Sequence, residues 1–275
     1  MKLTPTPVAL CAERLGLELH TPDRVRFIVD TLADLQPDAL VVVSYGQILT
    51  SKLLGIAPHG GINLHASLLP RWRGAAPIHR ALAAGDEYTG VATMRMERTL
   101  DTGAVLLEHR LRIRDDHDAE NLEAELADAG APLMLQTLTG LAAGTLADRP
   151  QDNAHTTYAH MLVKEDGYLD FRSHSAVQVD RIVRAFAKRP GTLVNINDVP
   201  VKVLAGVITR VASTAAPGTV LGSDATGLHV CTTENNYVIQ TLQPPGKPAL
   251  QASAYANGAR LTYPCIASAP MTPAT

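Results

Sequence analysis

The sequence GINLHASLLP at residues 61–70 decides the fold class. Ile62 and Leu64 alternate with Asn63 and His65, and this period of two predicts a strand with one buried face. Upstream, ALVVV at residues 39–43 is a continuous apolar run, typical of a strand buried on both faces. An amphipathic helical pattern beginning at Asp23 precedes it. Alternating strands and helices predict an open α/β sheet.

The first half of the chain contains further elements of both kinds. We expect helices at 8–15, 23–35, 48–54, 75–84 and 118–141, the last interrupted between Gly130 and Pro132, and strands at 17–20, 39–43, 61–65, 89–97 and 104–113. The last two strands read as an antiparallel pair. Such a sheet usually starts with a strand, whereas this chain starts with a helix. We therefore expect a first β–α–β unit of about 30 residues to be missing, which leaves the strand at 39–43 as an exposed edge.

The second half has a different pattern. A helix at 175–187 is followed by short strands at 191–196, 199–208, 218–221, 228–232 and 237–242, separated by Gly, Pro, Asn and Asp turns. Short, evenly spaced strands predict a small, OB-like β-barrel. We expect a catalytic domain at 1–144, incomplete at its start, a linker at 145–163 and a barrel domain at 164–275.

Composition and charge narrow the function class. The 275 residues carry a net charge of −3, which excludes a uniformly basic nucleic-acid binder. Residues 1–163 have a net charge of −6 and residues 164–275 of +3, which indicates either a polyanion touching the second half or ordinary surface variation. Three distant cysteines and the absence of a long apolar run predict a cytoplasmic protein without a membrane segment.

The strand at 61–65 also carries the residues best suited to chemistry. Asn63 and His65 are two apart, so they point to the same side of the sheet. An amide and an imidazolium can stabilise an oxyanion, and Asp101, in the downstream turn LDTG, could orient the imidazole. A purely structural role for the pair stays open, as do His59, His79 and His109 as alternatives. A metal site is the weaker hypothesis, because the spacing is not diagnostic.

Four segments resemble one family: VVSYGQIL at 42–49, INLHASLLPRWRGAAPI at 62–78, LDTG at 100–103 and LQPPGK at 242–247. They are similar to the folate-dependent formyltransferases, and the second and fourth segments favour the members that formylate methionyl-tRNA. The resemblance implies a Rossmann-like catalytic domain and formyl transfer from 10-formyltetrahydrofolate to the α-amine of initiator methionyl-tRNA, without a metal. It also implies a monomer.

The resemblance assigns roles residue by residue. It places catalysis on Asn63, His65 and Asp101. Folate contacts fall on Tyr45, Gly46, Ile48, Leu49, Ser67, Leu68, Leu69, Pro70, Leu100, Thr102 and Gly103. For tRNA contacts we expect Arg71, Arg73, Arg172, Arg181, Arg184, Lys188, Arg189 and Lys247. Two alternatives remain: a non-catalytic remnant that binds tRNA or folate, and a formyltransferase that acts on a sugar or small amine.

Overall fold

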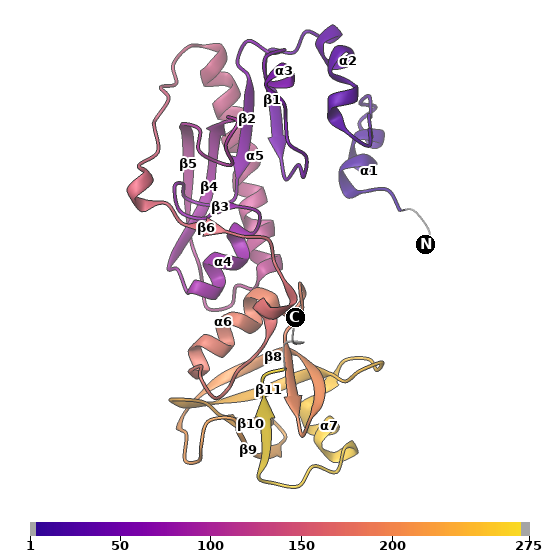
Figure 1. The fold of residues 1–275 in the computed structure, drawn as a ribbon, viewed down its shortest axis with the longest axis vertical. Helices are drawn as coiled ribbons and strands as arrows, with labels where there is room; N and C mark the ends of the chain where they lie inside the picture. The colour runs from indigo at the N-terminus through magenta and orange to yellow at the C-terminus, as the bar shows by residue number, and fades with distance from the viewer. Residues whose placement is uncertain (1–3, 271–275) are drawn as a thin grey trace.

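The computed structural model describes residues 4–270 and contains two main sheets, one in each half of the chain (Figure 1). The first sheet has the strand order β1-β2-β4-β5. Its strands are β1 (Leu40–Val43), β2 (Gly61–His65), β4 (Tyr88–Arg95) and β5 (Val105–Arg112). β1 and β2 are parallel, whereas β4 pairs antiparallel with both β2 and β5. The α/β class and the antiparallel pair are confirmed.

One long helix, α5 (Ala119–Ala142), packs against this sheet. The predicted interruption between Gly130 and Pro132 is wrong, because α5 is continuous. Gly130 is buried, and a Cβ there would lie 2.5 Å from the Leu64 side chain, so glycine lets the helix approach β2 closely. Pro132 is exposed. The carbonyl that loses its helical partner belongs to Asp128, which also faces solvent, so the proline is tolerated.

The N-terminal segment is less regular than the sequence predicts. It forms α1 (Pro7–Arg14), a 3-10 turn (Val25–Phe27), α2 (Val29–Asp34) and α3 (Ser51–Leu54). The strand predicted at 17–20 is not present, and Leu17 and Leu19 are exposed. The helix predicted at 23–35 is shortened to the 3-10 turn and α2, and the helix predicted at 48–54 is shortened to α3. Their apolar residues form a small separate cluster around Val25, Val29 and Leu53.

Strand β1 lies at the edge of the sheet. Among the described strands only β2 pairs with it. Val41 and Val43 are 47% and 54% exposed, so the prediction of a strand buried on both faces is wrong and the prediction of an exposed edge is confirmed. The reason is that a Val-rich strand is buried only when neighbours cover it, and α5 contacts chiefly β4 and β5.

The second sheet closes into a barrel. Its order is β10-β9-β13-β7-β8-β11-β12, and an additional β10–β11 pairing closes six strands into a ring. The strands are β7 (Leu193–Ile196), β8 (Val199–Ala212), β9 (Thr219–Asp224), β10 (Gly227–Cys231), β11 (Asn235–Gln243), β12 (Leu250–Gln251) and β13 (Cys265–Ser268). Sequence reasoning missed β12, β13 and α7 (Ala252–Gly258).

Helix α6 (Ala176–Phe186) joins the two halves. Ala185 and Phe186 are buried in a cluster with Leu82, Leu122 and Leu126 from the first half. In the first half, α4 (Pro77–Ala84) contacts α6, and Arg80 forms an ion pair with Asp166. The two halves therefore share part of one core.

The segment predicted as a linker is bound to the first half. It includes β6 (Tyr158–Ala159), which pairs with β3 (Arg73–Gly74). Arg149 and Val105 exchange two backbone hydrogen bonds. The domain boundaries stay predictions, and their outer ends, residues 1–3 and 271–275, lie outside the described residues. Within residues 4–270, no helix is long and apolar enough to cross a membrane.

Candidate active site

Strand β2 places Asn63 and His65 on the face of the sheet opposite α5. Leu64, between them, packs towards Gly130 of α5. Asn63 pairs with Met94 and His65 with Ala92 across the β2–β4 ladder. Paired residues share a face, and Ala92 and Met94 form a small apolar cluster on this side. The prediction that the two polar side chains point the same way therefore agrees with the register.

The His65 ring faces an oxygen atom at each nitrogen. It is only 6% exposed, and its Nε2 lies 2.9 Å from the backbone carbonyl oxygen of Trp72. Its Nδ1 lies 3.7 Å from Asp101 Oδ2. A neutral imidazole has one N–H donor, whereas the imidazolium has two. The surroundings therefore suit a ring that carries both protons during a reaction.

Asp101 reaches His65 from the turn between β4 and β5. Its φ of +53° lies in the left-handed region, which Asp tolerates better than most residues. Its Oδ2 accepts a hydrogen bond of 2.9 Å from the backbone N–H of Gly74. The side chain is 11% exposed. The sequence placed Asp101 only in a loop, and the tertiary structure brings its carboxylate beside the imidazole.

Gln151 is a residue that sequence reasoning missed. Its Nε2 donates to the backbone carbonyls of Asp101 at 2.9 Å and Gly103 at 2.7 Å. Its Oε1 accepts from the Arg73 guanidinium at 2.9 and 2.8 Å. The segment PQDN at 150–153 carries only a turn signal, so no local pattern could have identified it.

Two of the residues assigned to the substrates need a correction. Arg73 is 3% exposed and its guanidinium binds Gln151 and Asn153, so it is not free for a tRNA phosphate. Ser67 is fully buried, and its hydroxyl donates to the Arg71 carbonyl at 2.6 Å. It is therefore not available to folate. Both residues hold the 65–74 turn in place.

The other predicted folate residues have mixed exposure. Leu69 is buried among Ala92, Met94 and Val105. Tyr45 and Ile48, which follow β1, are 45% and 90% exposed, and Leu100 is 69% exposed. The remainder are exposed (Gly46), partly buried (Leu49, Leu68, Pro70, Thr102) or buried (Gly103).

Several predicted tRNA cations are paired with carboxylates. Arg71 donates to both oxygens of Asp86, at 2.7 and 2.6 Å, and this hydrogen bonding raises its pKa. Trp72 also donates to Asp86 from its indole, with the Arg71 guanidinium over the ring at 4.5 Å. This contact supports a packing role for Trp72. Arg71 remains 44% exposed beside the turn that carries His65.

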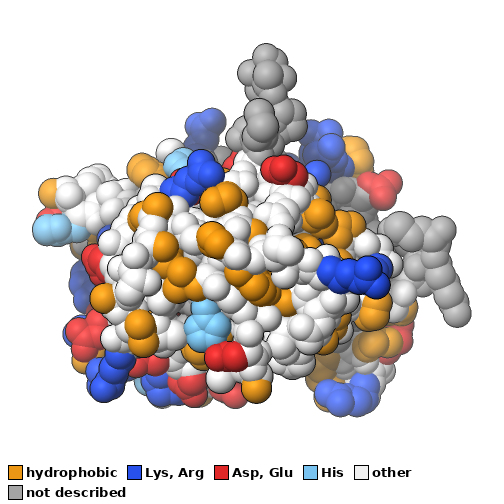
Figure 2. All heavy atoms as spheres, turned by 90° about the horizontal axis from the view of Figure 1, so that it is seen from below, with side chains coloured by type: hydrophobic (Ala, Val, Ile, Leu, Met, Phe, Trp, Pro, Cys, Tyr) orange, Lys and Arg blue, Asp and Glu red, His pale blue; other side chains and the backbone are white. Residues whose placement is uncertain are grey.

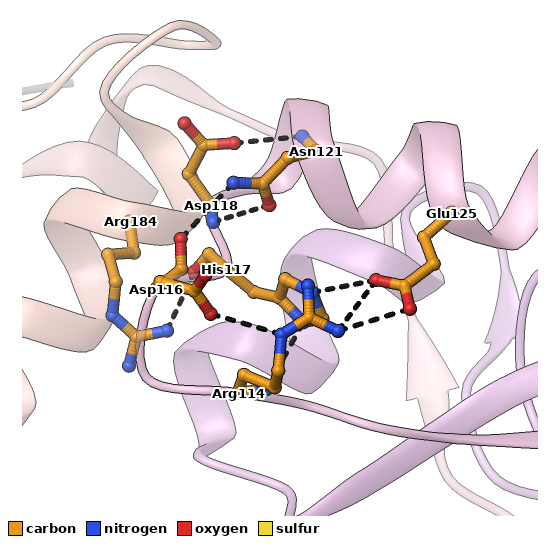
Figure 3. A network of polar contacts seen from close by, with 7 residues as sticks. All are labelled: Arg114, Asp116, His117, Asp118, Asn121, Glu125 and Arg184. Atoms are coloured by element: carbon orange, nitrogen blue, oxygen red, sulfur yellow. Dashed lines mark hydrogen bonds and ion pairs between the residues drawn. The ribbon is translucent and has the colours of Figure 1, made fainter.

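The cations at and just after α6 line one groove between the two halves. Arg181, Arg184 and Lys188 border this groove of about 790 Å³ together with several aspartates. Arg184 donates to Asp180, and Lys188 pairs with Glu120. Arg184 also donates to the backbone carbonyl of His117, as Figure 3 shows. The groove thus has a mixed charge, whereas tRNA contacts are expected at these three cations.

The buried His117 takes part in the network of polar contacts shown in Figure 3. Its Nδ1 accepts from the Arg114 backbone N–H at 3.1 Å, and its Nε2 lies 2.8 Å from Glu125. Arg184 reaches the His117 carbonyl from the other half of the chain. This network connects α6 to the start of α5. Arg184 therefore has a structural role that does not depend on a ligand.

The remaining predicted tRNA cations are Arg172, Arg189 and Lys247, and all three are exposed. Figure 2 views the barrel end of the molecule and shows mostly uncharged and apolar side chains, with the Lys and Arg side chains towards the rim. Cations are therefore not gathered on this end of the barrel. Within residues 4–270, no group of three His, Cys, Asp or Glu side chains is arranged to hold a metal ion.

Comparisons with known proteins agree with this architecture. Residues 6–138 match the family model "Formyl transferase" and residues 161–260 match "Formyl transferase, C-terminal domain". The crystal structure of the sugar 3N-formyl transferase WlaRD, with dTDP and 5-N-formyl-THF, has a TM-score of 0.64 at 14% identity, covering 86% of this chain and 81% of that one. HypX from Aquifex aeolicus, solved with tetrahydrofolic acid, has a TM-score of 0.65 at 16% identity, covering 85% and 41%. These two likenesses concern the fold alone.

Sequence relatives are much closer. The methionyl-tRNA formyltransferase of Halorhodospira halophila is 42% identical over 94% of this chain and 84% of its own length. That of Pseudomonas fluorescens is 43% identical over 94% and 81%. The chain therefore belongs to the formyl transferase family, in the branch of the methionyl-tRNA formyltransferases.

Proposed function

We propose that this protein transfers the formyl group of 10-formyltetrahydrofolate to the α-amine of initiator methionyl-tRNA. The observation that carries the proposal is the meeting of His65 and Asp101 beside Asn63 on one face of β2. An amide, an imidazole and a carboxylate suit acyl transfer without a covalent enzyme intermediate, because they can stabilise an oxyanion and handle protons. The sequence relatives bear the name of this activity.

The chemistry begins with attack by the neutral amine on the formyl carbon. An α-amine has a reference pKa of about 7.7–8.0, so a reactive fraction exists near neutral pH. The new C–N bond converts the formyl oxygen into an oxyanion. The Asn63 amide donates a hydrogen bond to this oxygen, and such a donor contributes roughly 10²–10³ in rate. The positive charge of a protonated His65 ring stabilises the same oxygen electrostatically, while the ring nitrogens face Trp72 and Asp101.

Breakdown of the tetrahedral intermediate completes the transfer. The bond between the formyl carbon and N10 of the folate breaks, and N10 takes up the proton that the amine releases. Asp101 keeps the His65 ring oriented and stabilises its positive charge across 3.7 Å. It also accepts or passes protons through water. No metal is needed at any step.

The substrates would approach from the two loops around this face. Tyr45, Ile48 and Leu100 offer exposed apolar surface suited to a flat pterin ring. Arg71 stands beside the His65 turn, where it could meet the acceptor end of the tRNA. Arg172, Arg189 and Lys247 supply exposed positive charge for phosphates farther along.

A formyl-transfer assay with the purified 275-residue chain tests the proposal. We expect turnover with 10-formyltetrahydrofolate and methionyl-tRNA, and His65→Ala should lower kcat roughly 10²–10³-fold. The matched control is His109→Ala, which removes an exposed histidine from β5 and should leave the rate unchanged.

Two outcomes would contradict the proposal. Saturable binding of tRNA or folate without turnover would identify a binding remnant instead. Turnover with a sugar amine in place of methionyl-tRNA would change the acceptor class. Because solved sugar formyltransferases share only the fold at 14–17% identity, the structure does not favour that acceptor.

A further inference from the structure

We propose that Gln151, backed by the buried Arg73, is a positioning residue that holds Asp101 in reach of His65. The inference rests on the proposed function for its catalytic consequence, although its structural part does not. It gives the segment predicted as a linker a direct part in the active site.

The Asp101 loop needs an external support because of where it leaves the sheet. Strand β4 ends at Arg95, which pairs with Ile62 near the start of β2. His65 lies three residues farther along β2, a distance of roughly 10 Å at 3.3 Å per residue. The loop must therefore fold back along the sheet face. A φ of +53° at Asp101 adds a conformational cost that the surroundings must offset.

Gln151 supplies this support through both ends of its amide. Its Nε2 donates to the carbonyls of Asp101 and Gly103, while its Oε1 accepts twice from Arg73. A guanidinium can only donate, so the oxygen must face Arg73 and the NH2 group must face the loop. The orientation of the amide is thus fixed by its partner rather than free to flip.

Arg73 and Gly74 both position Asp101, Arg73 through Gln151 and Gly74 directly. Arg73 fixes Gln151 and also donates to Asn153 Oδ1 at 2.9 Å. Its neighbour Gly74 donates its backbone N–H to the Asp101 carboxylate at 2.9 Å. Gly74 has a φ of +120°, and a Cβ there would lie 2.6 Å from the Ala159 carbonyl oxygen. One dipeptide therefore sets the position of both the main chain and the carboxylate of Asp101.

The decisive variant is Gln151→Glu. A carboxylate still pairs with Arg73, so the buried guanidinium keeps a partner and the segment stays anchored. The two N–H donors are lost, however, and an acceptor now faces the carbonyls of Asp101 and Gly103. Gln151→Ala, which removes both contacts, is the second variant. Asp152→Ala is the matched control. Asp152 is the exposed neighbour of Gln151 and caps the 3-10 turn Asn153–His155.

Kinetics separate positioning from a general structural effect. We expect Gln151→Glu to lower kcat roughly 10²-fold, the loss associated with a misplacement of about 1 Å, while KM for methionyl-tRNA changes less than about threefold. In an Asp101→Asn background the same substitution should cost little more, because it acts through the missing carboxylate. If the losses in kcat from Gln151→Glu and Asp101→Asn multiply in the double variant, the proposal is overturned. A loss in kcat of similar size in Asp152→Ala would overturn it as well.

Hydrogen exchange gives a readout without substrate. The Gly74 N–H is bonded to Asp101, whereas the neighbouring Ala75 N–H is bonded to the Ala159 carbonyl at 2.7 Å. In both Gln151 variants we expect Gly74 to lose about tenfold or more of its protection while Ala75 keeps its own. Unchanged protection at Gly74, or equal loss at both amides, would refute the proposal. If the wild-type chain shows no formyl transfer, the proposed function fails, and this exchange experiment still decides the role of Gln151.

Discussion

Replacing Asp101 by Asn should slow formyl transfer strongly while leaving the fold intact. The Asn side chain has nearly the same shape as Asp. Its Oδ1 can still accept the hydrogen bond from the Gly74 N–H, which in the wild type goes to the Asp101 carboxylate at 2.9 Å. What disappears is the negative charge 3.7 Å from His65 Nδ1. The variant therefore isolates the electrostatic contribution of the carboxylate.

The geometry sets the expected size of the effect. Two unit charges 3.7 Å apart attract by about 1.1 kcal/mol at the dielectric constant of water and by about 4.5 kcal/mol at an effective value near 20. Each 1.36 kcal/mol corresponds to about tenfold in rate, so the loss in kcat/KM lies between roughly 6-fold and 2,000-fold. Because the two side chains are only 6% and 11% exposed, we expect the upper part of this range.

The assay compares kcat/KM for formylation of methionyl-tRNA in wild type and Asp101→Asn. Asp148→Asn is the control, since Asp148 is 50% exposed and pairs with Arg95 away from His65. Thermal unfolding of all three proteins should coincide closely. A kcat/KM for Asp101→Asn within threefold of wild type would refute the idea that this carboxylate supports a charged ring in the transition state.

Two further predictions concern the interface between the halves. Phe186→Ala should cost about 3–5 kcal/mol because the ring is 2% exposed in a core shared by both halves; at about 2 °C per kcal/mol, calorimetry should show Tm lower by roughly 6–10 °C, whereas exposed Leu135→Ala should leave Tm nearly unchanged. Burial lowers the pKa of His79, whose ring stacks on Phe186. His79 therefore binds a proton more readily in the unfolded chain, where its pKa is about 6.5, than in the folded protein. The free energy of unfolding keeps its full value above about pH 6.5 and decreases as the pH falls through the folded-state pKa. Urea midpoints between pH 5 and 7.5 should show this slope, and an equal slope in His79→Gln would contradict it.

Several features followed from the sequence because they depend on neighbouring residues. The period of two in GINLH placed Asn63 and His65 on one face of a strand, and the β4–β5 pair and most barrel strands followed from similar local patterns. The helix predicted at 175–187 is α6, and its capping box between Ser175 and Gln178 joins neighbouring residues. The segments of family resemblance are contiguous and needed no structure.

The tertiary structure decided the features that depend on distant residues. Asp101 meets Gly74 across 27 positions and Gln151 across 50, so no local pattern could predict either contact. The burial of Arg73 likewise depends on the segment at 149–159, which the sequence marks only as a linker.

The continuity of helix α5 and the exposure of strand β1 also depend on the tertiary structure. Helix α5 is continuous although glycine and proline locally favour a break, and the Leu64 side chain packs into the space that a side chain at Gly130 would fill. The Val-rich strand β1 is exposed because burial depends on which elements cover a strand. The sequence by itself thus determined which side chains share an element and a face. The tertiary structure alone decided which of them meet, because desolvation and hydrogen bonding between distant segments have no local signature.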